Sequence, residues 1–151
     1  MSHIPVNHHL RPLYRVIAAL SAVWLLVFGA VGLNQTHGAE WFARGQWSAF
    51  GVPTNRAFAV ASLGVGAVVL LATLVGRNVD RLVNLWGGTA FLVAGTLMMA
   101  LVETDANVLN FSIITSIVSY VIGLLLLAAG LYGKVGTSEQ AAAEEAFRHG
   151  R

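Results

Sequence analysis

Long apolar runs that are almost free of charge alternate with polar segments along this chain. Four such runs occupy about residues 13–33, 57–76, 82–102 and 111–132. An α-helix rises 1.5 Å per residue, so about 20 apolar residues cross a hydrocarbon layer of roughly 30 Å. The pattern therefore predicts an all-α protein, a polytopic membrane bundle of four helices over residues 13–133.

Small residues form stripes on these predicted helices. In the fourth run Thr115, Ser119 and Gly123 are spaced by four, and Gly130 follows seven positions later. Small side chains let helix backbones approach closely, which matters because lipid gives no hydrophobic drive for helix association. Further small positions are Ser62, Gly66, Gly88 and Gly95. Packing within the bundle is the simplest interpretation, and a face for an oligomer or a partner is the alternative.

Composition agrees with a membrane protein of one domain. The chain has 151 residues, of which 56% are hydrophobic and 11% are charged, against about 25% charged in soluble domains. Without cysteine it has no disulfide and no thiolate metal site. The basic residues are scattered at the ends of segments, a pattern that argues against nucleic-acid binding.

The longest connection, residues 34–56, is rich in aromatic side chains. It contains Trp41, Phe42, Trp47 and Phe50 among glycines and polar residues. Tryptophan at the end of a membrane span prefers the headgroup level. We therefore predict a Trp-rich outer loop that lies along the membrane surface.

The two other connections and the chain ends are short. Residues 77–81 and 103–107 are tight polar turns, which join antiparallel helices. Residues 1–12 form a polar segment in which prolines discourage helix before residue 13. In the tail, residues 134–151, Thr137 and Gln140 predict a capping box before a short helix.

Basic residues are distributed unequally between the two sides. Those on the side of both termini are Arg11, Arg15, Arg77, Arg81, Lys134, Arg148 and Arg151, and those on the other side are Arg44 and Arg56. The positive-inside rule then places the N-terminus and the C-terminus in the cytoplasm. A basic start followed by an apolar run also fits a signal peptide, but the length of the run and the later spans favour an uncleaved first helix.

The sequence offers little for catalysis. All four predicted spans lack ionisable residues in mid-span, where such residues are costly and usually functional. We predict no cofactor and no metal site, since the adjacent His8 and His9 lack acidic neighbours. A group of outer charges comprises Glu40, Arg44, Arg56, Glu103 and Asp105. Fixing two loops at the interface is the favoured role of this group, and guiding a cation or holding a partner is the alternative.

A weak internal repeat runs through the sequence. Residues of the second run, such as Ser62 and Gly66, recur 57 positions later as Ser119 and Gly123. Residues 24–29 also resemble residues 90–95. Two helix hairpins of the same orientation are a known theme in transporters. Apolar segments drawn from few residue types also match by chance, so both explanations stay open.

Four motifs resemble a known family. They are LYRVIAALSAVWLLVFGAVGL at 13–33, GRN at 76–78, TDANVLNFS at 104–112 and GLYGK at 130–134. Together they resemble small four-span actinobacterial membrane proteins grouped as a domain of unknown function (DUF family 4383). The resemblance implies a multi-pass protein of the plasma membrane with unassigned activity, and it assigns no site residue.

These observations favour a non-catalytic protein that acts by association, as an accessory or stabilising subunit of a larger membrane complex. Its expected partners are the lipid bilayer and a membrane protein or further copies of itself. A small oligomeric transporter or channel is the alternative. An enzyme would need an active site in the outer loop around His37, Glu40 and Arg44.

Overall fold

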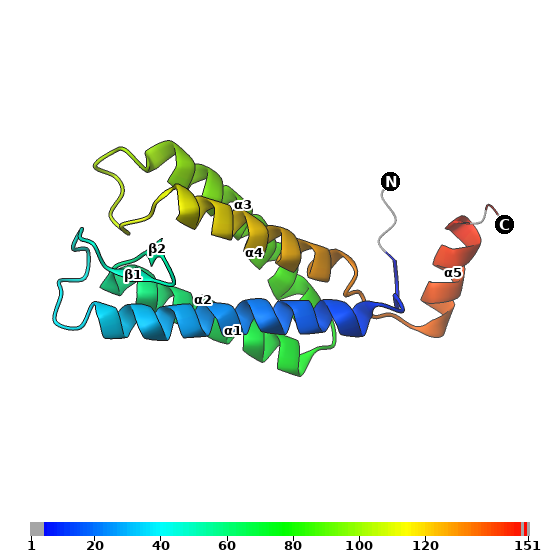
Figure 1. Cartoon of the computed structure of the whole chain (residues 1–151). Helices are drawn as coiled ribbons and strands as arrows, with labels where there is room; N and C mark the ends of the chain where they lie inside the picture. Colours follow the sequence, from blue (N-terminus) through cyan, green and yellow to red (C-terminus); the bar gives the residue numbers. More distant parts are fainter. Residues whose placement is uncertain (1–4, 149, 151) are drawn as a thin grey trace.

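The computed structural model describes residues 5–148 and Gly150, and in this part the chain is mostly helical (Figure 1). The helices are α1 (Arg11–Gln35), α2 (Arg56–Val75), α3 (Val79–Leu101), α4 (Ile113–Leu131) and α5 (Ser138–Arg148). Helices α1 to α4 are each long and apolar enough to cross a membrane. The predicted all-α membrane fold is confirmed at this level.

Two helices begin earlier than the apolar runs indicate. Helix α1 begins at Arg11 because Pro12 lies in its first turn, where a missing N–H is no loss. The prediction that proline blocks helix before residue 13 is therefore wrong. Helix α3 begins at Val79, which places Asp80 in its first turn rather than in a loop. The prediction that residues 77–81 form a turn is accordingly wrong for residues 79–81, which belong to α3.

The four long helices form two hairpins. Helix α1 packs along α2, and α3 packs along α4, while contacts between the two pairs are sparser. Figure 1 shows the hairpins close together near the chain ends and diverging toward the opposite loops. We call these the terminal end and the loop end of the bundle.

Glycines allow the close approach within each hairpin. A Cβ atom on Gly66 of α2 would lie 3.0 Å from the carbonyl oxygen of Ala22 in α1. A Cβ atom on Gly88 of α3 would lie 2.5 Å from the backbone nitrogen of Leu127 in α4. These separations are too short for a larger residue, so the backbones touch where glycine stands.

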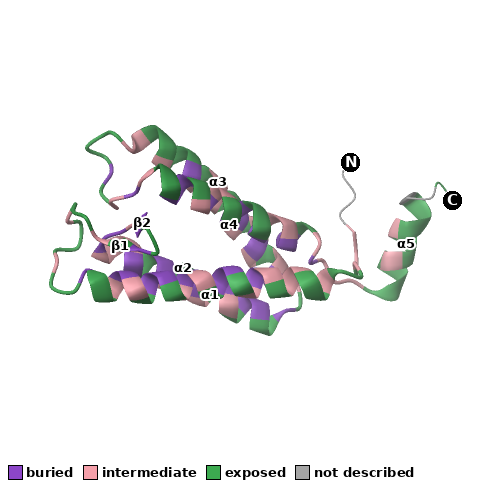
Figure 2. Cartoon of the chain, in the orientation of Figure 1, coloured by how far each residue is buried: buried purple, intermediate pink, exposed green. Residues whose placement is uncertain are grey.

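Apolar side chains lie both inside and outside the bundle. Ala22, Val69 and Leu126 are buried in a core shared by the hairpins. Large apolar residues such as Leu74 and Trp86 are mostly exposed, and exposed positions recur along all four long helices (Figure 2). A soluble protein rarely exposes so much continuous apolar surface, whereas a bilayer covers it.

Part of the outer loop folds back onto the bundle. Strands β1 (Ser48–Ala49) and β2 (Val52–Pro53) pair antiparallel. Ala49 and Val52 are buried against Phe28 of α1. The sequence did not predict this β-hairpin, whose turn residues Phe50 and Gly51 both have positive φ angles, as in type I′ turns.

Candidate functional site: a cavity between the hairpins

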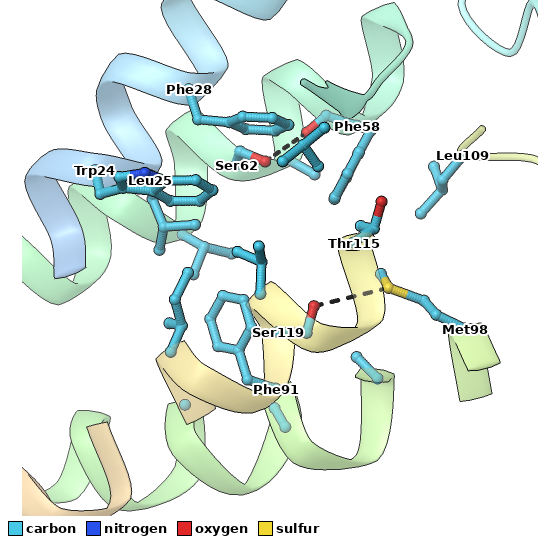
Figure 3. A pocket seen from close by; sticks show the side chains of 18 residues that line it. Trp24, Leu25, Phe28, Phe58, Ser62, Phe91, Met98, Leu109, Thr115 and Ser119 are labelled. Carbon is cyan, nitrogen blue, oxygen red and sulfur yellow. Dashed lines mark hydrogen bonds between the residues drawn. The ribbon is translucent and has the colours of Figure 1, made fainter. Parts of the chain in front are cut away.

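An apolar cavity of about 360 Å³ lies between the two hairpins. Helices α2 and α3 flank it, and α1, α4 and two residues of the connecting segments, Val52 and Leu109, contribute its remaining walls (Figure 3). We call it the central cavity. Its size falls within the range of about 300–1,000 Å³ that small-molecule sites occupy.

Aromatic rings form one wall of the central cavity. Trp24 stacks on Phe28 with ring centroids 5.3 Å apart, and Phe28 meets Phe58 edge-on at 5.6 Å. The first two rings come from α1 and the third from α2. Such paired rings hold one another in place, so this wall is rigid.

The few hydroxyl groups at the central cavity already have partners. Ser62 donates to the carbonyl oxygen of Phe58 at 2.9 Å, and Ser119 donates to the sulfur of Met98 at 3.8 Å (Figure 3). Thr115 Oγ1 accepts from the backbone N–H of Ser112 at 3.0 Å. All three hydroxyl groups are therefore engaged within the protein, and the hydroxyl protons of Ser62 and Ser119 are already donated.

The two hairpins make the same close contacts at matched positions. A Cβ on Gly123 would lie 3.0 Å from the carbonyl oxygen of Gly88, as one on Gly66 would from that of Ala22. Gly123 follows Gly66 by 57 positions, and Gly88 follows Ala22 by 66. These matched glycine contacts support the two-hairpin repeat, since chance similarity of apolar letters would not reproduce a contact.

A second contact repeats in the same way. A Cβ on Gly29 would lie 2.7 Å from the carbonyl oxygen of Ala59, and one on Gly95 would lie 3.2 Å from that of Ser116. The same two offsets, 66 and 57 positions, relate these residues. Both helix pairs therefore cross with the same register.

The central cavity lies where the matched positions face one another. Eight matched pairs supply sixteen of its eighteen lining residues. The pairs are Trp24/Ala90, Leu25/Phe91, Phe28/Ala94, Val52/Leu109, Phe58/Thr115, Ala61/Val118, Ser62/Ser119 and Val65/Ile122. Equal contributions from both hairpins place the cavity at the interface of the two repeats, where transporter folds hold their sites.

A second apolar groove runs between α1 and α4. Its walls include Ile17, Leu20 and Val121, and it shares Trp24 and Ile122 with the central cavity. These shared side chains separate the two spaces. The bundle is consequently open to its surroundings on both sides between the hairpins.

A buried carboxylate joins the hairpins at the terminal end. Asp80 is 1% exposed, and its Oδ2 lies 3.1 Å from Nη2 of Arg11 and 3.4 Å from Nε of Arg15. Its other oxygen accepts the backbone N–H of Arg81 at 2.9 Å. Two arginines balance one carboxylate, which makes the burial of this charge tolerable.

The same arginines reach the ends of the other two helices. Arg11 Nε donates to the carbonyl oxygen of Gly133 at 3.1 Å, just after α4. Arg15 donates to the carbonyl oxygen of Thr73 in the last turn of α2. Arg11, Arg15 and Asp80, the terminal clasp, thus tie all four long helices together.

Asparagine side chains hold the loop end. Asn55 caps α2 by accepting the N–H of Phe58 at 2.9 Å and donates to the carbonyl oxygen of Val108 at 2.8 Å. Asn110 donates to the carbonyl oxygens of Gly45 and Thr54. The loop between α1 and α2 is thereby fixed to the loop between α3 and α4.

The charged residues singled out in the sequence do not form one group. Arg44 pairs with Asp105 at 3.5 Å, and Arg56 lies over the ring of Trp41 at 4.7 Å from its centroid. No ion pair joins Glu40 or Glu103 to another residue in the part of the chain that the structure describes.

The small and aromatic residues singled out in the sequence take different places. Gly66, Gly88, Gly95, Gly123 and Gly130 lie in the contacts within hairpins, and Ser62, Thr115 and Ser119 line the central cavity. Trp41, Phe42 and Phe50 are exposed in the outer loop, whereas Trp47 is half-buried. The aromatic residues therefore do not form a single surface.

The described residues contain no group of three His, Asp or Glu side chains arranged to bind a metal ion. His8 stacks on His9 at 4.5 Å and packs against Tyr132 at 5.1 Å.

Comparisons of the chain with protein-family models, with curated proteins and with solved structures find no match. The resemblance to the four-span family of unknown function therefore stays a prediction.

Proposed function

We propose that this chain is a non-catalytic integral membrane protein that works by association, as an accessory or stabilising subunit of a larger membrane complex. The observation that carries the proposal is the outward face of α3. In α3, 17% of the apolar 18-residue segment is buried, against 33–44% in the other three long helices. Helix α3 is also the least apolar of the four.

The residues on this face suit contact with protein better than contact with lipid. Trp86 and Val93 are 71% and 54% exposed, and Thr89 and Thr96 are exposed beside them. A face turned to lipid alone is expected to be strongly apolar, whereas small and hydroxyl side chains favour helix–helix packing. A partner helix on this face of α3 would reconcile its low burial with its polarity.

The basic residues support a topology for this subunit. The terminal end carries Arg11, Arg15, Arg77, Arg81 and Lys134, and the loop end carries Arg44 and Arg56. By the positive-inside rule we place the terminal end in the cytoplasm and the protein in the plasma membrane. Both chain ends are then cytoplasmic, and the Trp-rich loop faces outward.

Purification of the tagged protein from its native membrane in a gentle detergent tests the proposal. We expect a stoichiometric membrane-protein partner that is lost in Val93→Trp, which adds bulk to the exposed face of α3. Val68→Trp is the matched control, because Val68 on α2 is 56% exposed and lies on another face. Recovery of the protein alone, or equal recovery of partner with both variants, would refute the association through α3.

A small oligomeric transporter or channel is the second candidate. The location of the central cavity between two matched hairpins favours it, since transporters use such interfaces. The apolar lining restricts this candidate to apolar solutes. Flux of such a solute in proteoliposomes of the purified protein would support it, and a lone homo-oligomer in the purification above would make that assay the next step.

A further inference from the structure

We propose that the central cavity binds one acyl chain of a membrane phospholipid, which enters sideways from the bilayer between α2 and α3. The proposal goes beyond association with a partner protein and applies to the isolated chain. It rests on the length, volume and chemistry of the cavity and on how the repeat produces it.

The cavity is about as long as one leaflet of a bilayer is thick. Gly87 and Met98 of α3 both line it. They are eleven positions apart, which corresponds to roughly 16 Å along a helix. Half of a hydrocarbon core of roughly 30 Å is about 15 Å. An extended acyl chain from one leaflet therefore matches the cavity in length.

A partner helix is too large for this space. A helix about 10–12 Å across fills on the order of 400–600 Å³ in each turn of 5.4 Å. The length of the cavity corresponds to about three turns, which need roughly 1,200–1,800 Å³, whereas all the empty space there amounts to about 1000 Å³. A thin hydrocarbon chain fits where a helix does not.

The chemistry of the walls selects a hydrocarbon. Apart from Ser62, Thr115 and Ser119 every lining residue is apolar or glycine. The three hydroxyl groups are engaged within the protein. A polar ligand would lose most of its hydrogen bonds to water on entering, and water does not stably fill a space whose walls are almost entirely apolar.

The difference between the two repeats produces the space. Trp24 and Phe28 of α1 correspond to Ala90 and Ala94 of α3. The rings of Trp24 and Phe28 occupy their side of the interface (Figure 3), whereas alanine side chains at the matched positions of α3 fill much less of theirs. The cavity therefore arises where the two hairpins differ, with aromatic residues at two positions of α1 and alanines at the matched positions of α3.

The position of the cavity indicates which leaflet supplies the chain. Val52 and Leu109 line it, and both belong to the loops of the loop end. At the opposite end the terminal clasp closes the bundle. The phospholipid consequently comes from the leaflet at the loop end, with the methyl end of its chain near Gly87.

Native mass spectrometry of the full chain tests this inference. The protein is reconstituted in phosphatidylcholine nanodiscs, extracted in detergent and released from the micelle. We expect one phosphatidylcholine per chain, and loss of that lipid in the double variant Ala90→Phe/Ala94→Phe, which fills the cavity. Ala30→Phe/Ala100→Phe is the control, because both alanines are exposed and neither lines the cavity.

The bound mass distinguishes the possible occupants. One phosphatidylcholine on the parent chain and on the control, but not on the cavity-filled variant, supports the inference. A free fatty acid, a detergent molecule, no adduct, or equal retention by all three chains overturns it. So does a co-purified protein whose binding the double variant abolishes.

A fluorescence measurement keeps the inference testable if the double variant fails to fold. Trp24 becomes the only tryptophan when Trp41, Trp47 and Trp86 are replaced by Phe. Phosphatidylcholine with a brominated acyl chain then quenches Trp24, and we expect the milder Ala94→Leu change to reduce that quenching. Trp24 also lines the groove between α1 and α4, so Val121→Phe in that groove is the control and should leave the effect of Ala94→Leu in place. Quenching that is unaffected by Ala94→Leu, whether or not Val121→Phe lowers it, would contradict an acyl chain in the central cavity.

Discussion

Oδ2 of Asp80 in α3 accepts a hydrogen bond from Nη2 of Arg11 in α1 at 3.1 Å and forms an ion pair with Nε of Arg15 at 3.4 Å, so this buried carboxylate joins the two helical hairpins. Arg11 and Arg15 each continue to a backbone carbonyl at the end of a further helix. The terminal end is therefore fixed by charge, while the loop end is fixed by asparagines and leaves the central cavity between them.

Removing the buried carboxylate should weaken the fold strongly. Asp80→Ala leaves two arginines facing each other without their partner, and breaking a buried ion pair costs about 3–5 kcal/mol. The free energy of unfolding in detergent, followed by circular dichroism, measures the loss. Asp105→Ala breaks the exposed pair with Arg44 and should leave the free energy of unfolding nearly unchanged, because solvent screens an exposed ion pair. Equal effects of the two variants would contradict the terminal clasp.

Two glycines on long helices should respond oppositely to alanine. Gly88→Ala places a methyl group against the backbone of α4 and should destabilise the protein by about 1–3 kcal/mol. Gly64→Ala meets no atom within 4 Å and should stabilise α2 by up to about 1 kcal/mol. Melting temperatures of both variants in the same detergent check this. A stable Gly88→Ala protein would mean that α3 and α4 are not in backbone contact.

The cap of α2 also ties the loops, so its removal should be costly. Asn55→Ala loses the bond to Phe58 and the bond to Val108, and should destabilise by about 1–2 kcal/mol. Hydrogen exchange of the amides at the start of α2 should rise with it. Asn34→Ala, at an exposed position near the end of α1, should leave both measurements unchanged. Unaltered exchange in Asn55→Ala would exclude the cap.

The turn of the β-hairpin contains a residue in an unfavourable conformation. Phe50 has φ of 53° and is 64% exposed, and a left-handed conformation costs most residues about 1–2 kcal/mol. Phe50→Asn should therefore raise the melting temperature, since asparagine adopts this turn readily. Phe42→Asn removes an exposed ring from ordinary backbone and should not raise it. A lower stability of Phe50→Asn would show that the ring itself contributes to the fold.

The long helices could be predicted because membrane spans are recognised from the length and hydropathy of apolar runs. The predicted runs and the observed helices differ by at most three residues at either end. The close contacts at Gly66 and Gly123 were also indicated by spacing, although sequence alone does not say which helix each glycine meets. The capping box of Thr137 and Gln140 is present before α5, since a local pattern of this kind needs no tertiary context.

The terminal clasp was missed because a charge next to a turn looks like a loop residue. Asp80 is the only acidic residue between residues 41 and 102, at an end that is otherwise basic. That imbalance is the signal that could have identified it. The β-hairpin gave a weaker signal still, because a strand of two residues has no measurable alternation.

The central cavity could not be predicted from residue types. It forms where small side chains leave space in the folded bundle, and the sequence does not show which small residues face such a space. The repeat offered an indirect route to it: with an offset of 66 positions, Trp24 and Phe28 align with two alanines. The only indication of that offset in the sequence was the similarity between residues 24–29 and residues 90–95. Contacts at matched glycines were needed to establish the register of the hairpins.

The labelling of introduced cysteines tests the four-span topology most directly, since the chain has no cysteine of its own. Single cysteines at Gln46 and Thr104 probe the loop end, and single cysteines at Arg77 and Ser138 probe the terminal end. In intact cells we predict that a membrane-impermeant thiol reagent labels the first pair only, and that the second pair reacts after permeabilisation. Labelling of one position from each end in intact cells would contradict four spans with both chain ends in the cytoplasm.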